Sequence, residues 1–574
     1  MTQNGISTIT CGPPIWLESL KAEKDFTTAS AIFELQTVRD TQMECPLGVA
    51  RLIAPWPIVG DNPRIRDNWF VPVARFPLYE YCSNYACRSL YLRDAGEGKS
   101  LACDRCGSRT RRGKWPTIQV PVVMVCASGH LSDFPWGQWL HQIEGPACSG
   151  PNDSLRYLPG SLPDRPRVEC RTCGRSRILN PREEKFTCMG GRPWLPGHPP
   201  EICHQEAQIM ERTSTAIYYP NVISSITVPP PGVDNPPLMH QLRANSAIRS
   251  QRRTYALDKS ESNINEIVHI CAQLGVNTDA DQVKRHLAEL EIERHEAEDR
   301  PRELDALLAG RLRPTKSYGL PDLIAEPQRI YDYQSDLITR IFQAVSLVPR
   351  LREVRVLTGF SRVRPADTPT TVNYEQLWGG PIPEPVPGDS RVGWLPAYEV
   401  FGEGILFQFR DDTVAEWERD IYEMVAARPM GRTRDLRGFL VHTLAHAIMR
   451  AAAPYSGYPL PSLRERIYDT DKRLAFLVYT SDGDLQGTLG GLVDLGRPGR
   501  LESLMEDAID RIRWCTTDPV CIEDGINLGR ADTTLPGACH HCLLVPETSC
   551  ERANRKLDRA SLIGIGGKGG LVGV

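Results

Sequence analysis

The sequence predicts a mixed α/β (α+β) protein of several domains, with a zinc-ribbon module near the N-terminus and a zinc-binding domain of helices and strands near the C-terminus. Three observations predict this class. The chain has 574 residues, which is enough for several domains of about 100 to 200 residues each. Strand-like and helical periodicities occupy different segments of the chain. Its 18 cysteines include tight groups with the spacing of metal ligands.

Composition divides the chain into four regions. Prolines interrupt the first region, whereas cysteine, glycine and arginine are frequent in the second. A charged helical pattern marks the third region, and a periodic apolar helix marks the fourth. The predicted regions are an N-terminal segment at 1–70, a double zinc-ribbon module at 71–210, a central mixed region with a charged helical arm at 211–420, and a C-terminal zinc-binding domain at 421–574.

Two segments have the periodicity of helices. Between about 260 and 312 many charged residues accompany only a thin apolar stripe that includes Leu287, so we expect a solvated helical arm. From Asp435 to Ala453, apolar residues recur at i, i+3 and i+4, which predicts a helix with one buried face. Pro454 is expected to end this helix.

The overall charge is close to neutral. Lys+Arg 67 against Asp+Glu 71 gives a net charge of −4, so no field of the whole protein attracts nucleic acid or a membrane. No segment approaches the run of about 20 apolar residues that spans a bilayer, and the first residues lack the pattern of a signal peptide. The sequence therefore predicts a cytoplasmic protein, in which clustered cysteines bind metal rather than form disulfides.

Two groups of four cysteines have the spacing of structural zinc sites. The first reads C-x4-C-x15-C-x2-C, and the other, near the C-terminus, reads C-x5-C-x17-C-x2-C. Two short-spaced pairs can converge on one tetrahedral ion, and four thiolates leave no position open for water, so the expected role is structural. In the C-terminal group Cys550, His540 or His541 could replace one of the four thiolates. The predicted ligands are Cys82, Cys87, Cys103 and Cys106 in the first group, and Cys515, Cys521, Cys539 and Cys542 in the C-terminal group.

A further zinc site is predicted between these two groups. Cys170 and Cys173 form a C-x2-C knuckle, and Cys188 with Cys203 could complete it, although Cys148 is a competing ligand. The stretch CASGHLSDFPWGQWLH contains more possible ligands, for which packing in an ordinary core is the favoured interpretation. They are Cys126, His130 and His141. In total we expect two to three structural zinc ions.

No catalytic motif is complete. AGEGKS resembles the end of a phosphate-binding loop, but Arg93 occupies the position of its first glycine, and the segment lies between the two halves of the first cysteine group. His442 and His446 have the spacing of the two ligands in H-E-x-x-H, but Thr443 replaces the glutamate that would act as general base. Packing or hydrogen bonding is therefore the favoured role for both histidines. The sequence predicts that the chain is not an enzyme.

Two segments concentrate basic residues. The first directly follows the knuckle formed by Cys103 and Cys106, and a zinc knuckle would give its side chains a rigid base for phosphate contacts. We therefore expect this segment, rather than the second, to bind DNA, while the alternative for both is that the side chains are solvated or pair with the chain's many carboxylates. The first segment contains Arg109, Arg111, Arg112 and Lys114, and the second contains Arg350, Arg352, Arg355, Arg362 and Arg364.

Longer motifs resemble known families. HTLAHAIMRAAAPYSGYPLPSLRERIY, WCTTDPVCIE and GACHHCLLVPETSC resemble the C-terminal zinc-binding domain of the MrfA group of repair helicases. CASGHLSDFPWGQWLH, CMGGRPWLPGHPPEIC and LREVRVLTGFSRVRP resemble the DrmB family of the bacterial anti-phage system DISARM. The similarity extends over most of the chain from about residue 70 onward.

The resemblance implies a non-catalytic adaptor subunit that forms a heterodimer with a DrmA-like helicase partner. It further implies that the complex binds and recognises foreign DNA, with a functional link to a host DNA methyltransferase. For the MrfA-type domain it implies four cysteine ligands, and it implies no ATP hydrolysis by this chain. Two alternatives remain: a metal-dependent nuclease or zinc hydrolase that uses His442 and His446, or a purely structural scaffold without DNA contact.

Overall fold

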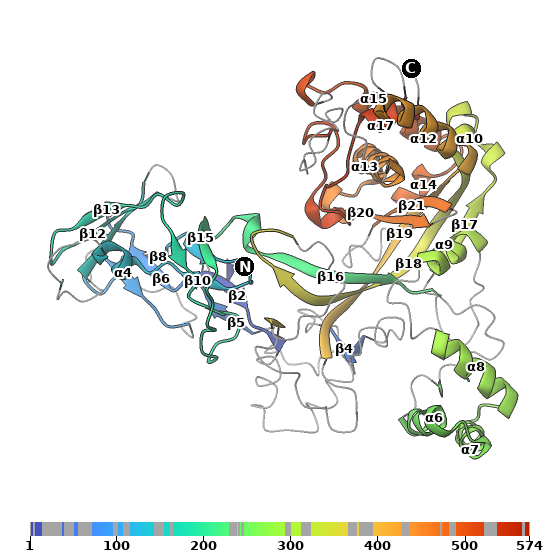
Figure 1. The fold of residues 1–574 in the computed structure, drawn as a ribbon, viewed down its shortest axis with the longest axis horizontal. Helices are drawn as coiled ribbons and strands as arrows, with labels where there is room; N and C mark the ends of the chain where they lie inside the picture. The colour runs from blue at the N-terminus through green and yellow to red at the C-terminus, as the bar shows by residue number, and fades with distance from the viewer. Residues whose placement is uncertain are drawn as a thin grey trace. The chain divides into compact units, whose positions relative to one another are not determined.

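A computed structural model shows a mixed α and β protein built from several parts, as the sequence predicts (Figure 1). Among the helices that the structure describes, none is both long enough and apolar enough to cross a membrane. The structure describes residues 2–3, 6–13, 37–38, 51–54, 72–95, 102–106, 115–142, 148, 154–160, 165–228, 238, 241–242, 246–292, 300–310, 323–365, 376–377, 394–426, 436–470, 473–480, 490–521, 537–564 and 569–572.

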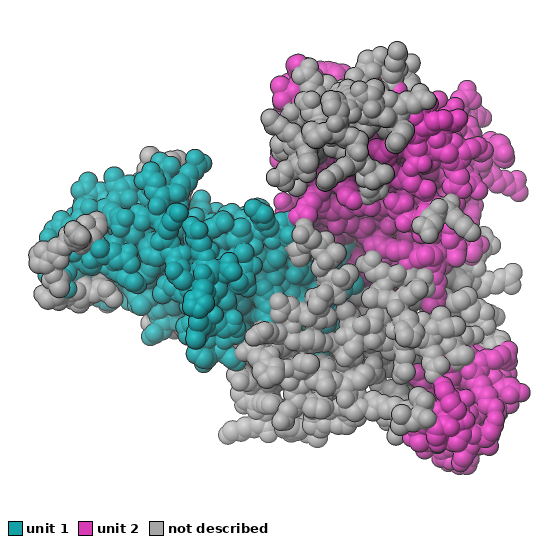
Figure 2. Space-filling model, in the orientation of Figure 1, with its two compact units in different colours: residues 1–39, 48–223, 355–398 teal, residues 40–47, 224–354, 399–574 magenta. Residues whose placement is uncertain are grey.

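The chain divides into two compact units, which Figure 2 distinguishes by colour. Unit 1 comprises residues 1–39, 48–223 and 355–398, and unit 2 comprises residues 40–47, 224–354 and 399–574. Three of the five boundaries between the units fall within strands. These strands are β16 (Tyr219–Ile226), β18 (Phe342–Ser361) and β19 (Trp394–Phe409).

Small antiparallel sheets form much of the described part of unit 1. Their strand orders are β1-β2-β5, β7-β6-β8, β10-β9-β15-β14 and β11-β12-β13. The strands are β1 (Thr2–Gln3), β2 (Ile6–Thr10), β5 (Val73–Arg75), β6 (Tyr79–Cys82), β7 (Leu90–Leu92), β8 (Thr117–Gln119), β9 (Val122–Val125), β10 (Leu131–Asp133), β11 (Leu155–Leu158), β12 (Arg167–Cys170), β13 (Ser176–Ile178), β14 (Phe186–Thr187) and β15 (Glu206–Glu211).

The core of these sheets is aromatic. Strand β9 has the sequence VVMV and is buried along its whole length, which suits its place between β10 and β15. Helix α4 (Trp136–His141) adds two tryptophans that are fully buried, and Trp136 packs edge to face on Tyr157. This core fixes the positions of the strand ends, and the cysteine groups lie at those ends.

A larger, eight-stranded sheet has the order β16-β18-β19-β21-β20, with β17 (Leu323–Gln328) paired to β18. Two short strands, β3 (Thr37–Val38) and β4 (Arg51–Ile53), extend it beside the first residues of β19, where β4 runs parallel to β19. Strands β20 (Leu463–Thr470) and β21 (Arg473–Thr480) form an antiparallel hairpin. Most residues of β21 are buried, because apolar clusters form on both faces of the sheet in unit 2.

Helix α13 (Leu436–Ser456) is the central helix of unit 2. It contacts β20 and β21 on one side and α15 (Leu501–Arg513) on another, and Figure 1 shows it between these elements. Further helices complete this part of the unit. They are α10 (Asp336–Ile341), α12 (Asp411–Ala426), α14 (Gly491–Leu495) and α17 (Ala560–Ile563). The predicted helix is confirmed, but it continues past Pro454 to Ser456; because Pro454 lies in the last turn, the hydrogen bond that its missing N–H removes lies at the helix end rather than in the interior.

The described part of the segment at about 260–312, expected to be a charged arm, contains three helices with buried faces, and a further helix precedes them. Helices α6 (Ser246–Asp258), α7 (Glu261–Gln273) and α8 (Ala280–Ile292) pack on one another, and Ile264, Ile267 and Cys271 of α7 are fully buried at helical spacing. Helix α9 (Arg300–Ala309) packs on β17 and buries Leu304. The prediction of a solvated arm was wrong, because the apolar face of α7 packs against α6 and α8, and α9 packs against β17.

Candidate metal centres

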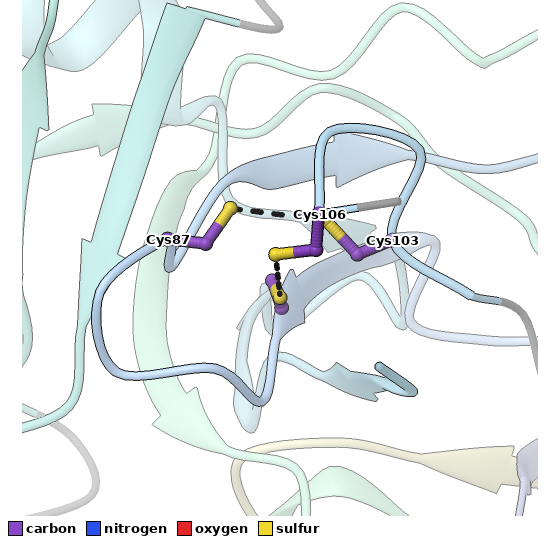
Figure 3. A group of neighbouring side chains, drawn as sticks. Cys87, Cys103 and Cys106 are labelled. Carbon is purple, nitrogen blue, oxygen red and sulfur yellow. Dashed lines mark hydrogen bonds between the residues drawn. The ribbon is translucent and has the colours of Figure 1, made fainter. Parts of the chain in front are cut away.

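The first cysteine group comes together as the sequence predicts. The ligand atoms of Cys82, Cys87, Cys103 and Cys106 all lie within 4.8 Å of one another. The Sγ atoms of Cys82 and Cys106 are 3.6 Å apart, and those of Cys87 and Cys103 are 3.7 Å apart. Four thiolates around a tetrahedral zinc ion, at about 2.3 Å from it, would be separated by about 3.8 Å. In Figure 3 the labelled cysteines point toward one another from neighbouring turns.

Short turns position these four sulfurs. Cys82 ends strand β6, and the backbone N–H of Asn84 donates to its Sγ at 3.4 Å. The second half of the group is held beside β8, because the N–H of Cys103 donates to the carbonyl of Trp115 at 2.8 Å. Burial alone would raise the pKa of the Cys87 thiol, but hydrogen bonds from Ser89 lower it to about 6. These hydrogen bonds favour the thiolate, the form of cysteine that binds zinc.

Cys170 and Cys173 do not share a group with Cys188 and Cys203, which were their expected partners. Their ligand atoms lie within 4.8 Å of those of His141 and Cys148 instead. Cys148 Sγ is 3.8 Å from Cys170 Sγ, and His141 Nε2 is 3.6 Å from Cys173 Sγ. The Nδ1–H of His141 donates to the carbonyl of Gly137 at 2.7 Å, which leaves the Nε2 lone pair facing the sulfurs. This group could hold zinc through three thiolates and one imidazole.

Cys188 and Cys203 form a separate group with Cys126 and His130. His130 Nδ1 lies 3.4 Å from Cys126 Sγ, and its Nε2 is 2.8 Å from a carboxylate oxygen of Glu201. A carboxylate on the far nitrogen is the arrangement that fixes the tautomer of many metal-binding histidines. The sequence predicted one site here, but the structure has two separate groups. One contains Cys170 and Cys173, and the other contains Cys188 and Cys203.

Strand pairing explains this regrouping. Cys126 directly follows β9, and β9 pairs with β10 so that Cys126 lies opposite His130, whose carbonyl accepts its N–H at 3.2 Å. Strand β15 pairs with the other side of β9, and β14 pairs with β15, so the N–H of Cys188 donates to the carbonyl of Gln205 at 2.8 Å. The four-stranded sheet thus gathers four distant ligands at one end. The C-x3-H spacing of Cys126 and His130 was the signal available in the sequence.

The C-terminal group also comes together as predicted. Cys515, Cys521, Cys539 and Cys542 have their sulfurs within 4.8 Å of one another. Cys515 and Cys539 are 3.3 Å apart at Sγ, and Cys521 and Cys542 are 3.7 Å apart. Hydrogen bonds from Thr517 and Cys515 lower the pKa of the Cys539 thiol to about 5, against the opposing effect of burial. The alternatives His540 and His541 are exposed and outside this group, and Cys550 belongs to another one.

The predicted DNA-binding side chains, Arg109, Arg111, Arg112 and Lys114, lie outside the described residues. The second basic segment is largely buried, and it pairs in part with a carboxylate, as one of its two alternatives expects. Arg352 forms an ion pair with Glu399 at 2.8 Å, and the guanidinium of Arg362 donates to the carbonyl of Gly129 at 2.7 Å. Strand β18 explains this burial, because alternate residues of a strand in the interior of a sheet face packed layers. Lys99 of AGEGKS also lies outside the described residues.

Clusters of cysteine and histidine that brace short strands and helix ends define a protein with several structural zinc sites. Residues 444–543 match the MrfA Zn-binding domain, and residues 3–219 match a domain of unknown function, DUF8724. The chain is 27% identical over 534 residues to the DISARM protein DrmB of Bacillus paralicheniformis, which covers 86% of this chain and 89% of that protein. Both resemblances expected from the motifs are thereby confirmed, as are structural zinc sites as the expected cofactor.

Proposed function

We propose that this chain is the DrmB-type subunit of a DISARM anti-phage system and acts as a non-catalytic adaptor. The observation that carries the proposal is the similarity to DrmB along nearly the whole of both chains. A match of that extent covers the cysteine-rich first unit as well as the MrfA-type domain, so it concerns the complete arrangement of domains rather than one shared module.

The zinc groups support a structural role. We infer that Cys82, Cys87, Cys103 and Cys106 bind one ion, and that Cys515, Cys521, Cys539 and Cys542 bind another. The two mixed groups, which contain His130 and His141, would each bind one more. In each group four protein ligands fill a tetrahedral shell, whereas a catalytic zinc keeps one position for water or substrate. These sites would hold turns in place and would not activate water.

ATP hydrolysis is assigned to a separate, helicase-like partner. Arg93 stands where a phosphate-binding loop needs its first glycine, and the guanidinium of Arg93 donates to the carbonyl of Ala102 at 3.2 Å. This contact connects the two halves of the first cysteine group. The segment around Lys99 therefore joins parts of a zinc ribbon, and we expect Lys99→Ala to leave the ATPase rate of the assembled complex unchanged.

DNA contact would come from the complex rather than from this chain alone. The net charge of −4 provides no general attraction to DNA, so we assign phosphate contacts to the local basic segment with Arg109, Arg111, Arg112 and Lys114. A functional link to a DNA methyltransferase follows from the proposed DISARM role.

Co-purification from the native host tests this proposal. A tagged chain is expected to retain a helicase-like ATPase at a constant ratio, and the complex is expected to shift DNA more strongly than the partner alone. A complex whose DNA affinity equals that of the partner alone would instead identify a scaffold. Divalent-metal-dependent cleavage of DNA by the purified chain, abolished in His442→Ala, would identify a nuclease and contradict the adaptor role.

A further inference from the structure

A fifth group of potential ligands lies in the core of unit 2. His442 and His446 are one turn apart on helix α13, Glu465 belongs to β20, and Cys550 follows a short 3-10 helix at Glu547–Ser549. Their ligand atoms all lie within 4.8 Å of one another. Both histidines are 0% exposed, Glu465 is 1% exposed and Cys550 is 9% exposed. Sequence spacing paired only the two histidines; it associated Cys550 with the C-terminal cysteine group and gave no signal for Glu465.

The distances within this group are close to those of a coordination shell. His442 Nε2 is 2.9 Å from one oxygen of Glu465 and 3.1 Å from Cys550 Sγ. His446 Nε2 is 3.4 Å from the other oxygen of Glu465. Nitrogen, oxygen and sulfur ligands on a tetrahedral zinc ion would be separated by about 3.3 to 3.8 Å. The observed separations lie at or slightly below this range.

Hydrogen bonds outside the group orient both imidazoles toward its centre. His442 Nδ1 lies 3.2 Å from the carbonyl of Lys556, and His446 Nδ1 lies 3.0 Å from the carbonyl of Leu543. A carbonyl only accepts, so each Nδ1 carries the proton and each Nε2 presents a lone pair inward. If both imidazoles are neutral and no ion is present, these lone pairs face the carboxylate of Glu465 and repel it. In the described part of the chain, Nε2 of His446 and Oε2 of Glu465 indeed have no hydrogen-bond partner.

The sulfur of Cys550 accepts backbone hydrogen bonds, as sulfurs in other cysteine groups do. The backbone N–H of Arg552 donates to Cys550 Sγ at 3.3 Å, and that of Asn554 donates at 3.1 Å. The same i to i+2 contact occurs at Cys82 with Asn84 and at Cys188 with Gly190. Two N–H donors stabilise a thiolate. Cys550 therefore has the surroundings of a metal ligand rather than of an apolar packing residue.

Charge balance also favours an ion. Two neutral imidazoles, one thiolate and one carboxylate carry a total charge of about −2, which a divalent cation neutralises. Without an ion, neutrality needs two protons, which either charge both imidazoles, whose ring centroids are only 4.4 Å apart, or leave Cys550 as a neutral thiol. Two like charges at that distance in a buried site would strongly disfavour each other. A dication neutralises the group without any added proton, and this favours a metal site.

We propose that His442, His446, Glu465 and Cys550 bind a zinc ion in a closed structural site that is separate from the four-cysteine site of the same domain. Imidazole, thiolate and carboxylate together suit zinc. Two histidines and a glutamate also bind catalytic zinc in some hydrolases, but here Cys550 fills the position that water would take. The site connects α13, β20 and the segment after Cys542. This inference does not depend on the proposed role in anti-phage defence.

The two zinc sites share a structural element. Leu543, whose carbonyl orients His446, directly follows Cys542 of the four-cysteine group. The guanidinium of Arg450, one turn further along α13, donates to the carbonyls of Leu544 and His541 at 2.6 and 3.0 Å. Only His446 and Glu465 of the proposed ligands fall within the residues that match the MrfA-type domain. The proposed site therefore extends that domain on both sides.

Native mass spectrometry of the full chain tests the proposal. The wild-type chain is expected to carry one zinc ion for each of the five groups. Cys550→Ser and Glu465→Gln are each expected to lose one ion, while Cys271→Ser, which removes another buried cysteine, keeps them all. Folded Cys550→Ser and Glu465→Gln variants with the wild-type zinc count would overturn the proposal.

Loss of a structural ion can prevent folding, so a measurement on the wild-type chain decides the question independently. Crystals measured on both sides of the zinc absorption edge should show an anomalous peak among His442, His446, Glu465 and Cys550. Peaks at the other cysteine groups without a peak here would identify a buried hydrogen-bonded network and contradict the proposal.

Discussion

Arg559 and Asp518 form a partly buried ion pair that positions the first cysteine of the C-terminal group. The guanidinium of Arg559 is fully buried and donates to one oxygen of Asp518, while the other oxygen accepts the backbone N–H of Cys515 at 2.7 Å. Arg559 also donates to the carbonyl of Ile512 at 3.3 Å, at the end of helix α15. A single side chain thus connects the end of a helix to a zinc ligand.

Replacing this arginine should destabilise unit 2. Arg559→Ala leaves Asp518 without its cation and opens a cavity, so we expect the free energy of unfolding to fall by roughly 3 kcal/mol. Denaturant unfolding of the zinc-loaded protein measures the change. The control is Arg513→Ala, because Arg513 pairs with Asp510 at an exposed site and should change stability by less than about 0.5 kcal/mol. Equal effects of the two substitutions would contradict the role assigned to Arg559.

The regrouping of the middle cysteines predicts a specific zinc count. Cys173→Ser and Cys203→Ser should each remove one ion, and the double variant should remove two, because the two residues belong to different groups. If they shared one site, as their order in the sequence suggests, the double variant would lose one ion only. Elemental analysis of the purified proteins measures the difference. Cys11→Ser, which removes a buried cysteine outside the groups, should lose none.

Asp133 should make stability depend on pH. Desolvation raises the pKa of its carboxyl to about 6, although the N–H groups of Leu78 and Tyr79 donate to it. The native state then binds a proton more tightly than the unfolded state, so the contribution of Asp133 is present at low pH and is lost as pH rises through about 6. Asp133→Asn keeps an acceptor without the charge. It should therefore stabilise the protein at neutral pH, by on the order of 2 kcal/mol.

Thermal unfolding of both proteins between about pH 5 and pH 8 tests this expectation. The advantage of Asp133→Asn should grow as pH rises to about 6 and level off above about 7, once the carboxyl is ionised in both states. The difference between the two proteins cancels the effect of acid on zinc binding, which they share. An advantage that is the same at every pH would show that Asp133 is not the titrating group.

Charge reversal should reveal DNA contacts in the first basic segment. Arg111→Glu with Arg112→Glu should weaken DNA binding by the complex, most strongly at low salt, and each lost phosphate contact should lower the slope of log affinity against log salt by about one. Gel-shift titrations at several salt concentrations measure the slope. The control reverses Arg165 and Arg182, two exposed arginines of the same unit. An unchanged slope in the first variant would assign the segment to solvated surface.

The sequence by itself determined the features that depend on neighbours in the chain. A C-x2-C pair fixes two sulfurs on one short turn, so the knuckles at Cys103 and Cys539 were predictable from spacing alone. Helical periodicity likewise predicted α13, because its apolar residues recur every turn. Long sequence motifs were sufficient to predict the resemblance to DrmB and to the MrfA-type domain.

Only the tertiary structure decided which distant residues complete each group. Pairing of β9 with β10 and β15 assigns Cys188 and Cys203 to Cys126 and His130, and no spacing rule spans those loops. Glu465 reaches the histidines of α13 because that helix packs on β20. Local turns place ligands that are a few residues apart, whereas ligands separated by whole strands meet only where sheet register and helix packing bring them together.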